Sequence, residues 1–128
     1  MSTTEHLGKL QLAIMRVLWR RGECTATEVH RALEPSHHLA PTTIATMLRK
    51  METKGVVAHR VDGRRFLYAP TVSAPDVTYS MVADLADRLF GGDVAALACH
   101  LIEQHEVGAA DLEDLRRRID TARKERRR

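Results

Sequence analysis

The spacing of apolar residues changes once within the first seventy positions, and this change constrains the fold more than any other feature. Up to residue 55, apolar side chains recur every three or four positions, as on one face of an α-helix. Beyond it, VVAHRV and RRFLYAP flank Asp62-Gly63, a pattern typical of two short strands joined by a tight turn. We therefore expect a mostly α fold with a small β-hairpin, in the order of a winged helix-turn-helix.

Three helices are expected before the hairpin. The first ends at a basic turn followed by Gly22. The second starts at TATE, residues 25–28, a capping box in which a Thr and a Glu side chain each bond the other's backbone amide, and it ends before Pro35. The third starts at Pro41, a residue favoured in a first helical turn, and ends at Gly55. Because aromatic residues make up only 4% of the chain, their common core should be aliphatic.

The third helix has one face without acidic residues. Its apolar stripe consists of Ile44, Met47, Leu48 and Met51. The opposite face carries only small or cationic side chains, and no Asp or Glu occurs between Glu34 and Glu52. Such a face suits a flat, negatively charged partner, which makes this segment the candidate recognition helix.

Threonines and cations on that face are the candidate DNA contacts. A helix in the major groove needs small side chains near its N-terminal end, and Thr can bond base edges and pack on a thymine methyl. We expect Thr42, Thr43 and Thr46 to contact bases, although Thr42 could equally be the helix cap. Arg49 and Lys50 lie further along, where phosphates or a guanine could be reached.

The hairpin tip supplies two further cations. Arg64 and Arg65 follow the expected turn, and a wing with Arg at its tip commonly contacts phosphate or the minor groove. The alternative is a charged edge strand that discourages pairing between sheets. We expect Phe66, Tyr68 and Trp19 to be core residues.

Charge is distributed unevenly along the chain. Residues 1–72 hold eleven Lys or Arg against six Asp or Glu, whereas residues 73–122 hold four against ten. Residues 123–128 hold five against one. A basic first half suits a polyanion, most commonly nucleic acid. A modestly basic domain can equally be basic for solubility alone.

No motif indicates catalysis. The chain has no Gly-rich phosphate loop, no HExxH and no nucleophile elbow, so we expect a protein that is not an enzyme and needs no cofactor. Cys24 and Cys99 show no CxxC or CxC spacing, which is typical of a reducing cytoplasm. The N-terminal segment has no apolar h-region, and no apolar run reaches the roughly 20 residues of a membrane span. Cys99-His100 with Glu103 could ligate a metal, but Cys99 also has the helical spacing of simple packing.

Pro70 and Pro75 bracket an expected linker. We therefore divide the chain into a winged-helix DNA-binding domain, residues 1–72, and a helical domain with a basic tail, residues 73–128. Three apolar stripes in the second domain predict three helices, which are separated from one another at Gly91-Gly92 and at Gly108. Asp111 is the expected cap of the last helix. The stripes are too short and too amphipathic to bury themselves, so a partner chain should cover them.

With these elements in place, the sequence resembles the BlaI/MecI/CopY family, the penicillinase, methicillin-resistance and copper-homeostasis repressors. The resemblance runs from about Leu7 to Lys124. It is carried by the segments LGKLQLAIMRVLW, APTTIATMLRKMETKGVVAHR and DGRRFLYAP, and by the Gly91-Gly92 pair.

The resemblance implies a bacterial transcriptional repressor. It implies a homodimer whose C-terminal helices interlock and whose two winged helices bind a palindromic double-stranded operator with TACA/TGTA-type half-sites. The residues that we expect at the dimer interface are Leu85, Leu89, Val94, Leu97, Leu101, Leu112, Leu115 and Ile119.

The chain departs from the family pattern at two places. Some members are released when a membrane receptor-protease cuts an Asn-Phe bond, but here the corresponding segment is Cys99-His100-Leu101, which leaves such a partner open. Copper-responsive members carry paired CxC motifs, whereas this chain has RKERRR there. Two alternatives also stay open: a winged-helix module that binds an acidic protein instead of DNA, and a metal-sensing repressor that uses Cys99 and His100.

Overall fold

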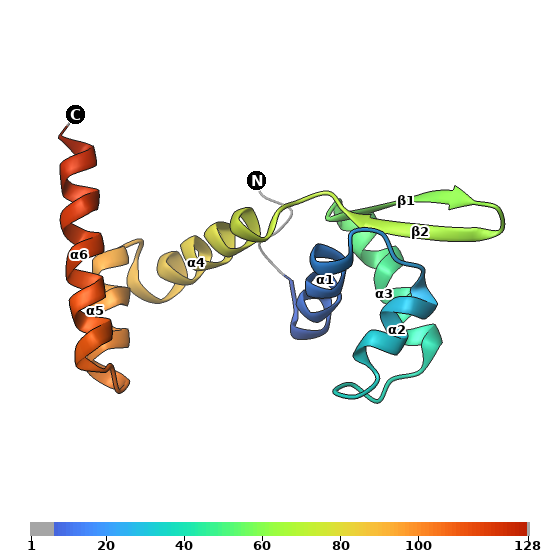
Figure 1. The fold of residues 1–128 in the computed structure, drawn as a ribbon, viewed down its shortest axis with the longest axis horizontal. Coiled ribbons are helices and arrows are strands. Elements are labelled where there is room, and N and C mark those ends of the chain that lie inside the picture. Colours follow the sequence, from blue (N-terminus) through green and yellow to red (C-terminus); the bar gives the residue numbers. More distant parts are fainter. Residues whose placement is uncertain (1–6, 128) are drawn as a thin grey trace. The chain divides into compact units, whose positions relative to one another are not determined.

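The computed structural model describes residues 7–127, which form six α-helices and one two-stranded antiparallel sheet (Figure 1). The chain divides into two compact units, Met1–Leu85 and Ala86–Arg128. In chain order the elements are α1 (Lys9–Arg21), α2 (Ala26–Leu33), α3 (Pro41–Lys54), β1 (Val57–Asp62), β2 (Arg65–Pro70), α4 (Ala74–Phe90), α5 (Val94–Gln104) and α6 (Ala109–Arg126).

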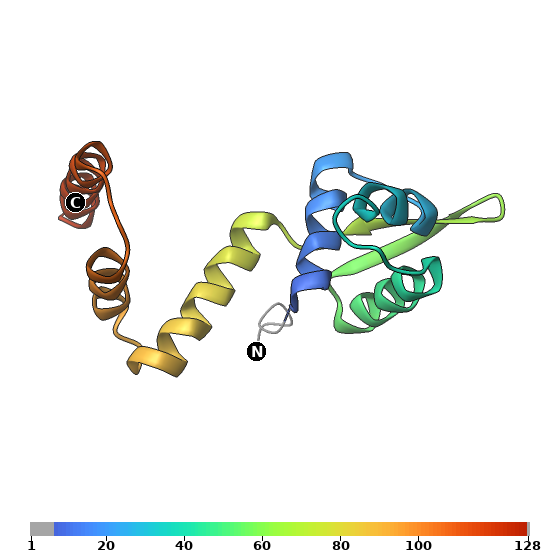
Figure 2. The same ribbon diagram turned by 90° about the horizontal axis from the view of Figure 1, so that it is seen from below.

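The first unit is a winged helix-turn-helix with an aliphatic core, as predicted. The helices α1, α2 and α3 pack on one another and on the hairpin (Figures 1 and 2). Its fully buried side chains include Ile14, Met15, Leu18, Ile44, Leu48 and Met51. Trp19 packs against this core but is only partly buried, and its Nε1 donates to the backbone oxygen of Val72 at 2.8 Å.

The expected helix boundaries are confirmed where local chemistry determines them. α1 ends at Arg21, and the cap residue that follows it, Gly22, has a φ of 88°, which is unfavourable for a residue with a Cβ. At the start of α2 the Thr25 hydroxyl accepts from the Glu28 amide at 3.1 Å, and the Glu28 carboxylate accepts from the Thr25 amide at 2.8 Å. α3 begins at Pro41 and ends before Gly55, which is left-handed with φ 88°.

The hairpin is as tight as predicted, but its corner is displaced by one residue. Asp62 pairs with Arg65, so Gly63 and Arg64 occupy the two corner positions. Gly63 has a φ of 65°, the positive value that a type II′ turn requires at its first corner position. A short bridge to Cys24 extends the sheet, because Cys24 and Tyr68 exchange backbone hydrogen bonds of 2.9 and 2.8 Å.

The prediction that Phe66 is a core residue is wrong. Tyr68 is buried, but the Phe66 side chain is 49% exposed and stacks on the His59 ring with centroids 4.2 Å apart. Phe66 pairs with Val61, which is 60% exposed, in the half of the hairpin nearer the turn. Alternation along the strand places Phe66 and Tyr68 on one face, but only the inner part of that face has a core to cover it.

The expected linker is shorter than predicted. α4 begins at Ala74, and Pro75 lies in its first turn, where a missing backbone N–H costs no helical hydrogen bond. Val77 is buried in the core of the first unit, and Met81 packs against it. The compact unit therefore reaches Leu85, beyond the division at residue 72 that the sequence predicts.

The second unit contains the end of α4, with α5 and α6. Asp93 caps α5, because its carboxylate accepts from the Ala96 amide at 3.0 Å. The prediction that Asp111 caps α6 is wrong: Gly108 is the cap residue, and Asp111 lies in the first turn. There its charge still faces the positive end of the helix dipole. No helix within residues 7–127 has both the length and the apolar character that crossing a membrane requires.

Candidate nucleic-acid interface

The candidate contacts of α3 share one solvent-exposed face. This face carries Thr42, Thr43, Thr46, Arg49 and Lys50, all of which are exposed. The opposite face of the helix is buried in the core and holds it in place. Because the apolar stripe packs the helix into the core, these five side chains are left in solvent and can contact a ligand.

Thr42 does not cap α3. The cap position belongs to Ala40, which makes no side-chain cap bond, and Thr42 is the second residue of the helix. The capping alternative for Thr42 is therefore wrong. Pro41 at the first helical position determines this outcome, because proline has no N–H to be capped and its fixed φ suits the helix start.

In the described part of the chain, Arg49 and Lys50 of α3 are not neutralised by acidic neighbours. Arg49 donates to the Thr46 hydroxyl at 3.4 Å, a weak contact between two exposed side chains. Across residues 7–127, neither Arg49 nor Lys50 forms an ion pair with a carboxylate. Their charges are therefore available to an anionic partner. The hydroxyl of Thr53, on the same face, is used within the helix, where it donates to the Arg49 backbone oxygen at 3.2 Å.

Two polar contacts hold α3 against its neighbours. On one side, Lys54 donates to the Gln11 side-chain oxygen of α1 at 2.9 Å. On the other side, the Nδ1 of His59 on β1 lies 2.7 and 2.8 Å from the two oxygens of Glu52. These contacts connect α3 with α1 and with the wing.

The Glu52–His59 contact was not foreseen from the sequence. Its two residues are separated by the Gly55 turn, and only the close approach of α3 and β1 brings them together. The same His59 ring stacks on Phe66 of β2, so one side chain connects the helix with both strands. We see no signal in the sequence that could have identified this contact.

The wing carries three exposed arginines, which differ in whether a carboxylate pairs with them. Arg64 occupies the hairpin corner, with its side chain in solvent. Arg65 forms an ion pair with its strand partner Asp62 at 3.0 Å. Arg60 donates two hydrogen bonds to Glu23, at 2.7 and 2.9 Å, and these lower the pKa of Glu23 and raise the pKa of Arg60. Arg64 is therefore the wing cation best placed to accept a new anionic partner.

The helices α4, α5 and α6 expose most of the apolar residues expected at a dimer interface. Seven of the eight are exposed by 38% to 66%, namely Leu85, Leu89, Val94, Leu101, Leu112, Leu115 and Ile119. Leu97 differs, because only 7% of it is exposed. Three exposed apolar residues were not foreseen: Tyr79 and Val82 on α4 and Ile102 on α5.

The cysteines do not form part of a metal cluster in the described part of the chain. Cys24 is buried, and burial raises the pKa of its thiol. Cys99 is exposed, and the neighbouring His100 ring lies 5.7 Å from the Phe90 ring. Residues 7–127 contain no group of three or more His, Cys, Asp or Glu side chains close enough to hold a metal ion.

Comparison with known proteins gives consistent matches over nearly the whole chain. The family model described as penicillinase repressor matches residues 7–121. The penicillinase repressor of Bacillus licheniformis is 24% identical over 115 residues, covering 90% of each chain. The transcriptional regulator BlaI of Mycobacterium tuberculosis is 34% identical over 121 residues, covering 93% of this chain and 86% of that one.

A solved structure supports the fold of the first unit. The solution structure of the DNA-binding domain of the repressor BlaI superposes with a TM-score of 0.52 and 30% identity. The match covers 59% of this chain and 93% of that domain. The winged helix described above is thus similar to a domain whose function in that protein is DNA binding.

Proposed function

The chain belongs to the penicillinase repressor family, whose members are transcriptional repressors and not enzymes, and we propose that it represses transcription as a homodimer bound to a palindromic operator. The observation that carries this proposal is the exposed, acid-free face of α3 beside a cationic wing. A repressor of this kind acts where its operator is, so we place it in the cytoplasm.

We assign the contacts to DNA as follows. Thr42, Thr43 and Thr46 contact base edges in the major groove, because their side chains are short enough to let the helix backbone approach. Arg49 and Lys50 contact phosphates flanking those bases. Arg64 and Arg65 contact phosphate or the neighbouring minor groove from the wing.

We assign dimerisation to the apolar surface of the second unit together with the exposed stripe of α4. The surface includes a hollow of about 450 Å³ lined by Leu101, Ile102, Val107 and Leu115 among others. Burying such a side chain contributes about 1.5–3 kcal/mol, so the seven exposed predicted residues would support a stable dimer. The assignment extends to Tyr79, Val82 and Ile102. Leu97 is buried within its own chain, so it packs behind the exposed interface residues of α5.

The test is fluorescence anisotropy with a TACA/TGTA dyad duplex and a scrambled duplex of the same composition, titrated over a salt series. If the four cations of each protomer neutralise one phosphate each, log Kobs falls with log salt at a slope of about −7. That slope corresponds to a loss of about 10⁴-fold in affinity between 50 and 200 mM salt.

The outcomes separate the candidate functions. Preference for the dyad with a steep salt slope supports an operator-binding repressor. Equal binding of both duplexes contradicts this operator, and absence of binding at low salt contradicts DNA as the partner of the α3 face.

A further inference from the structure

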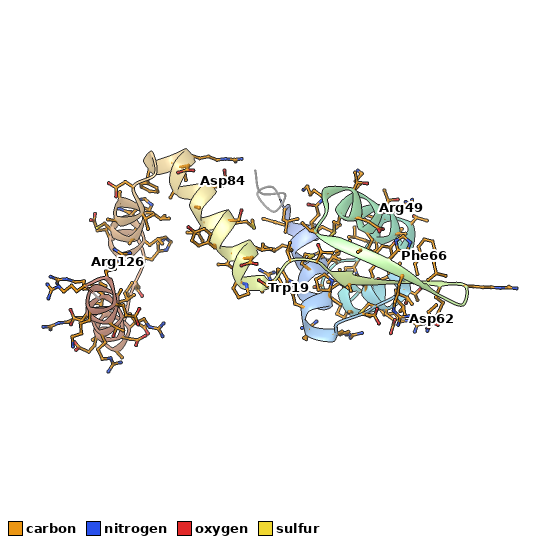
Figure 3. All side chains as sticks on the ribbon, turned by 90° about the horizontal axis from the view of Figure 1, so that it is seen from above. Trp19, Arg49, Asp62, Phe66, Asp84 and Arg126 are labelled. Carbon is orange, nitrogen blue, oxygen red and sulfur yellow. The ribbon has the colours of Figure 1, made fainter. Side chains whose placement is uncertain are left out.

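A crevice of about 620 Å³ lies within the first unit between α2, α3 and β2. Arg31 lines it from α2, Arg49 from α3, and Arg65 and Phe66 from β2. Figure 3 labels Arg49 on α3 and Phe66 on the hairpin, where it belongs to β2. Three arginines that are distant in the sequence thus line one hollow, although only two of them belong to the recognition helix and the wing.

The crevice has an excess of positive charge. Its one acidic lining residue is Glu28, whose carboxylate is occupied by the Thr25 amide of the capping box, a bond that lowers the pKa of Glu28. Arg31 forms no ion pair with any residue between 7 and 127, and Arg49 contacts only the Thr46 hydroxyl. An anion in the crevice would therefore meet unneutralised guanidinium groups.

The start of α2 adds two hydrogen-bond donors to the same wall. Ala26 and Thr27 line the crevice and are the first two residues of the helix, so their amides have no partner within it. No other bond to these amides occurs in the described part of the chain. Free amides at a helix start are favourable partners for phosphate oxygens.

Beside Arg65, β2 contributes two aromatic rings to the wall of the crevice. The half-exposed ring of Phe66 is held by its stack on His59, and Tyr68 lies below it. A lone inorganic ion would make no use of this ring, whereas a sugar attached to a phosphate would pack against it. Arg49 and Arg65 also belong to the proposed DNA contacts, so a nucleic-acid strand that passes from α3 to the wing must cross this crevice.

We propose that the crevice binds one backbone phosphate of DNA, with Arg31 as a phosphate contact contributed by α2 and Phe66 as the surface for the adjoining sugar. The proposal rests on the proposed DNA-binding function and adds to it a contact from the first helix of the helix-turn-helix. A phosphate contact carries no sequence information, so its loss weakens binding to every duplex alike.

The first experiment measures the salt slope of Arg31→Gln with the dyad and scrambled duplexes. Losing one phosphate contact per protomer makes the slope of log Kobs against log salt less steep by about 1.8 for the dimer. The loss of affinity between 50 and 200 mM salt then shrinks by about 12-fold. The matched control is Arg16→Gln, which removes the same charge from an exposed position on α1 and should leave the slope near that of the unmodified protein. Arg31→Lys should keep most of the slope, because it keeps the charge.

An unchanged slope in Arg31→Gln, or an equal decrease in Arg16→Gln, would overturn the proposal. A weaker binding to the dyad alone would also contradict it, because that result would indicate base recognition at Arg31. Circular dichroism of each variant excludes unfolding as the cause.

The second experiment needs no DNA. Inorganic phosphate is titrated into the full chain at constant ionic strength, with chloride as the balancing ion, and backbone amide shifts are followed by NMR. Shifts concentrated at Thr27 and Arg31 that disappear in Arg31→Gln support an oxyanion site, and shifts spread evenly over the surface contradict one. Concentrated shifts in a protein that binds no duplex would overturn DNA as the source of the phosphate and, separately, the proposed function.

Discussion

Replacing Thr46 by Glu should abolish operator binding while leaving the fold intact. The side chain at position 46 is exposed on α3, one turn before Arg49 and Lys50. A Glu there lies at the i,i+3 and i,i+4 spacings from these two cations and would pair with both of them. Each such pair stabilises a helix by about 0.2–0.5 kcal/mol, so we expect an unfolding temperature equal to or slightly above that of the unmodified protein.

The cost falls on the complex with DNA. Losing one base contact costs about 1–3 kcal/mol in each half-site. Pairing Arg49 and Lys50 with the new Glu removes two phosphate contacts per protomer. The expected salt slope then becomes less steep, changing from about −7 to about −3.6. Even the smaller cost of about 1 kcal/mol per half-site, summed over both half-sites, weakens the affinity for the operator about 30-fold. The lost phosphate contacts bring the total loss of affinity beyond about 10²-fold.

The assay is anisotropy with the dyad duplex over the salt series, beside thermal unfolding of the same preparation. Thr121→Glu is the matched control, because Thr121 is also an exposed helical Thr, on α6, and the hydroxyls of both residues bond within their own helix: that of Thr46 accepts from Arg49, and that of Thr121 donates to the Arg117 backbone oxygen. The control should bind as the unmodified protein does. A folded Thr46→Glu dimer with normal affinity would refute the assignment of α3 as the recognition helix.

Three further predictions concern stability, assembly and pH. Leu48→Ala, at a fully buried position of α3, should lower the free energy of unfolding by about 2–5 kcal/mol in urea denaturation, and a cost below 1 kcal/mol would contradict a single tightly packed core. Leu115→Asp should yield a monomer in sedimentation analysis, whereas an unchanged dimer would remove α6 from the interface. The Thr25 amide lowers the pKa of Glu28 in the folded state. The hydrogen bond between them therefore adds its full contribution to the free energy of unfolding above the ordinary pKa range of Glu, and this contribution is lost as the pH falls through the lowered pKa of Glu28. Glu28→Gln should therefore flatten the acid side of the unfolding-temperature profile, and a profile identical to that of the unmodified protein would argue against the capping box as its cause.

The parts of the fold that depend on local chemistry could be predicted from the sequence. The capping box at residues 25–28, the proline start of α3 and the glycine ends of α1 and α3 each require particular residue types at particular spacings. The stripe of α3 also predicted its exposed face, because a helix with one apolar side must turn the other to solvent. These features involve residues at most four positions apart.

Errors arose where the outcome depended on what a residue meets across the fold. Alternation predicted that Phe66 and Tyr68 share a face, but it could not show that the core ends between them. Pro75 marked a boundary in the sequence, yet α4 begins before it and packs Val77 into the first unit.

The sequence by itself determined the winged helix and the exposed, acid-free face of α3, because both follow from periodicity and local capping. Only the tertiary structure decided the crevice, in which Arg31, Arg49 and Arg65 line one hollow, and the Glu52–His59 contact that holds the wing. Such groupings depend on how α2, α3 and the hairpin pack in three dimensions. Spacing along the chain carries no record of that packing, because the interacting residues lie on different elements whose mutual distances are set by the shared core.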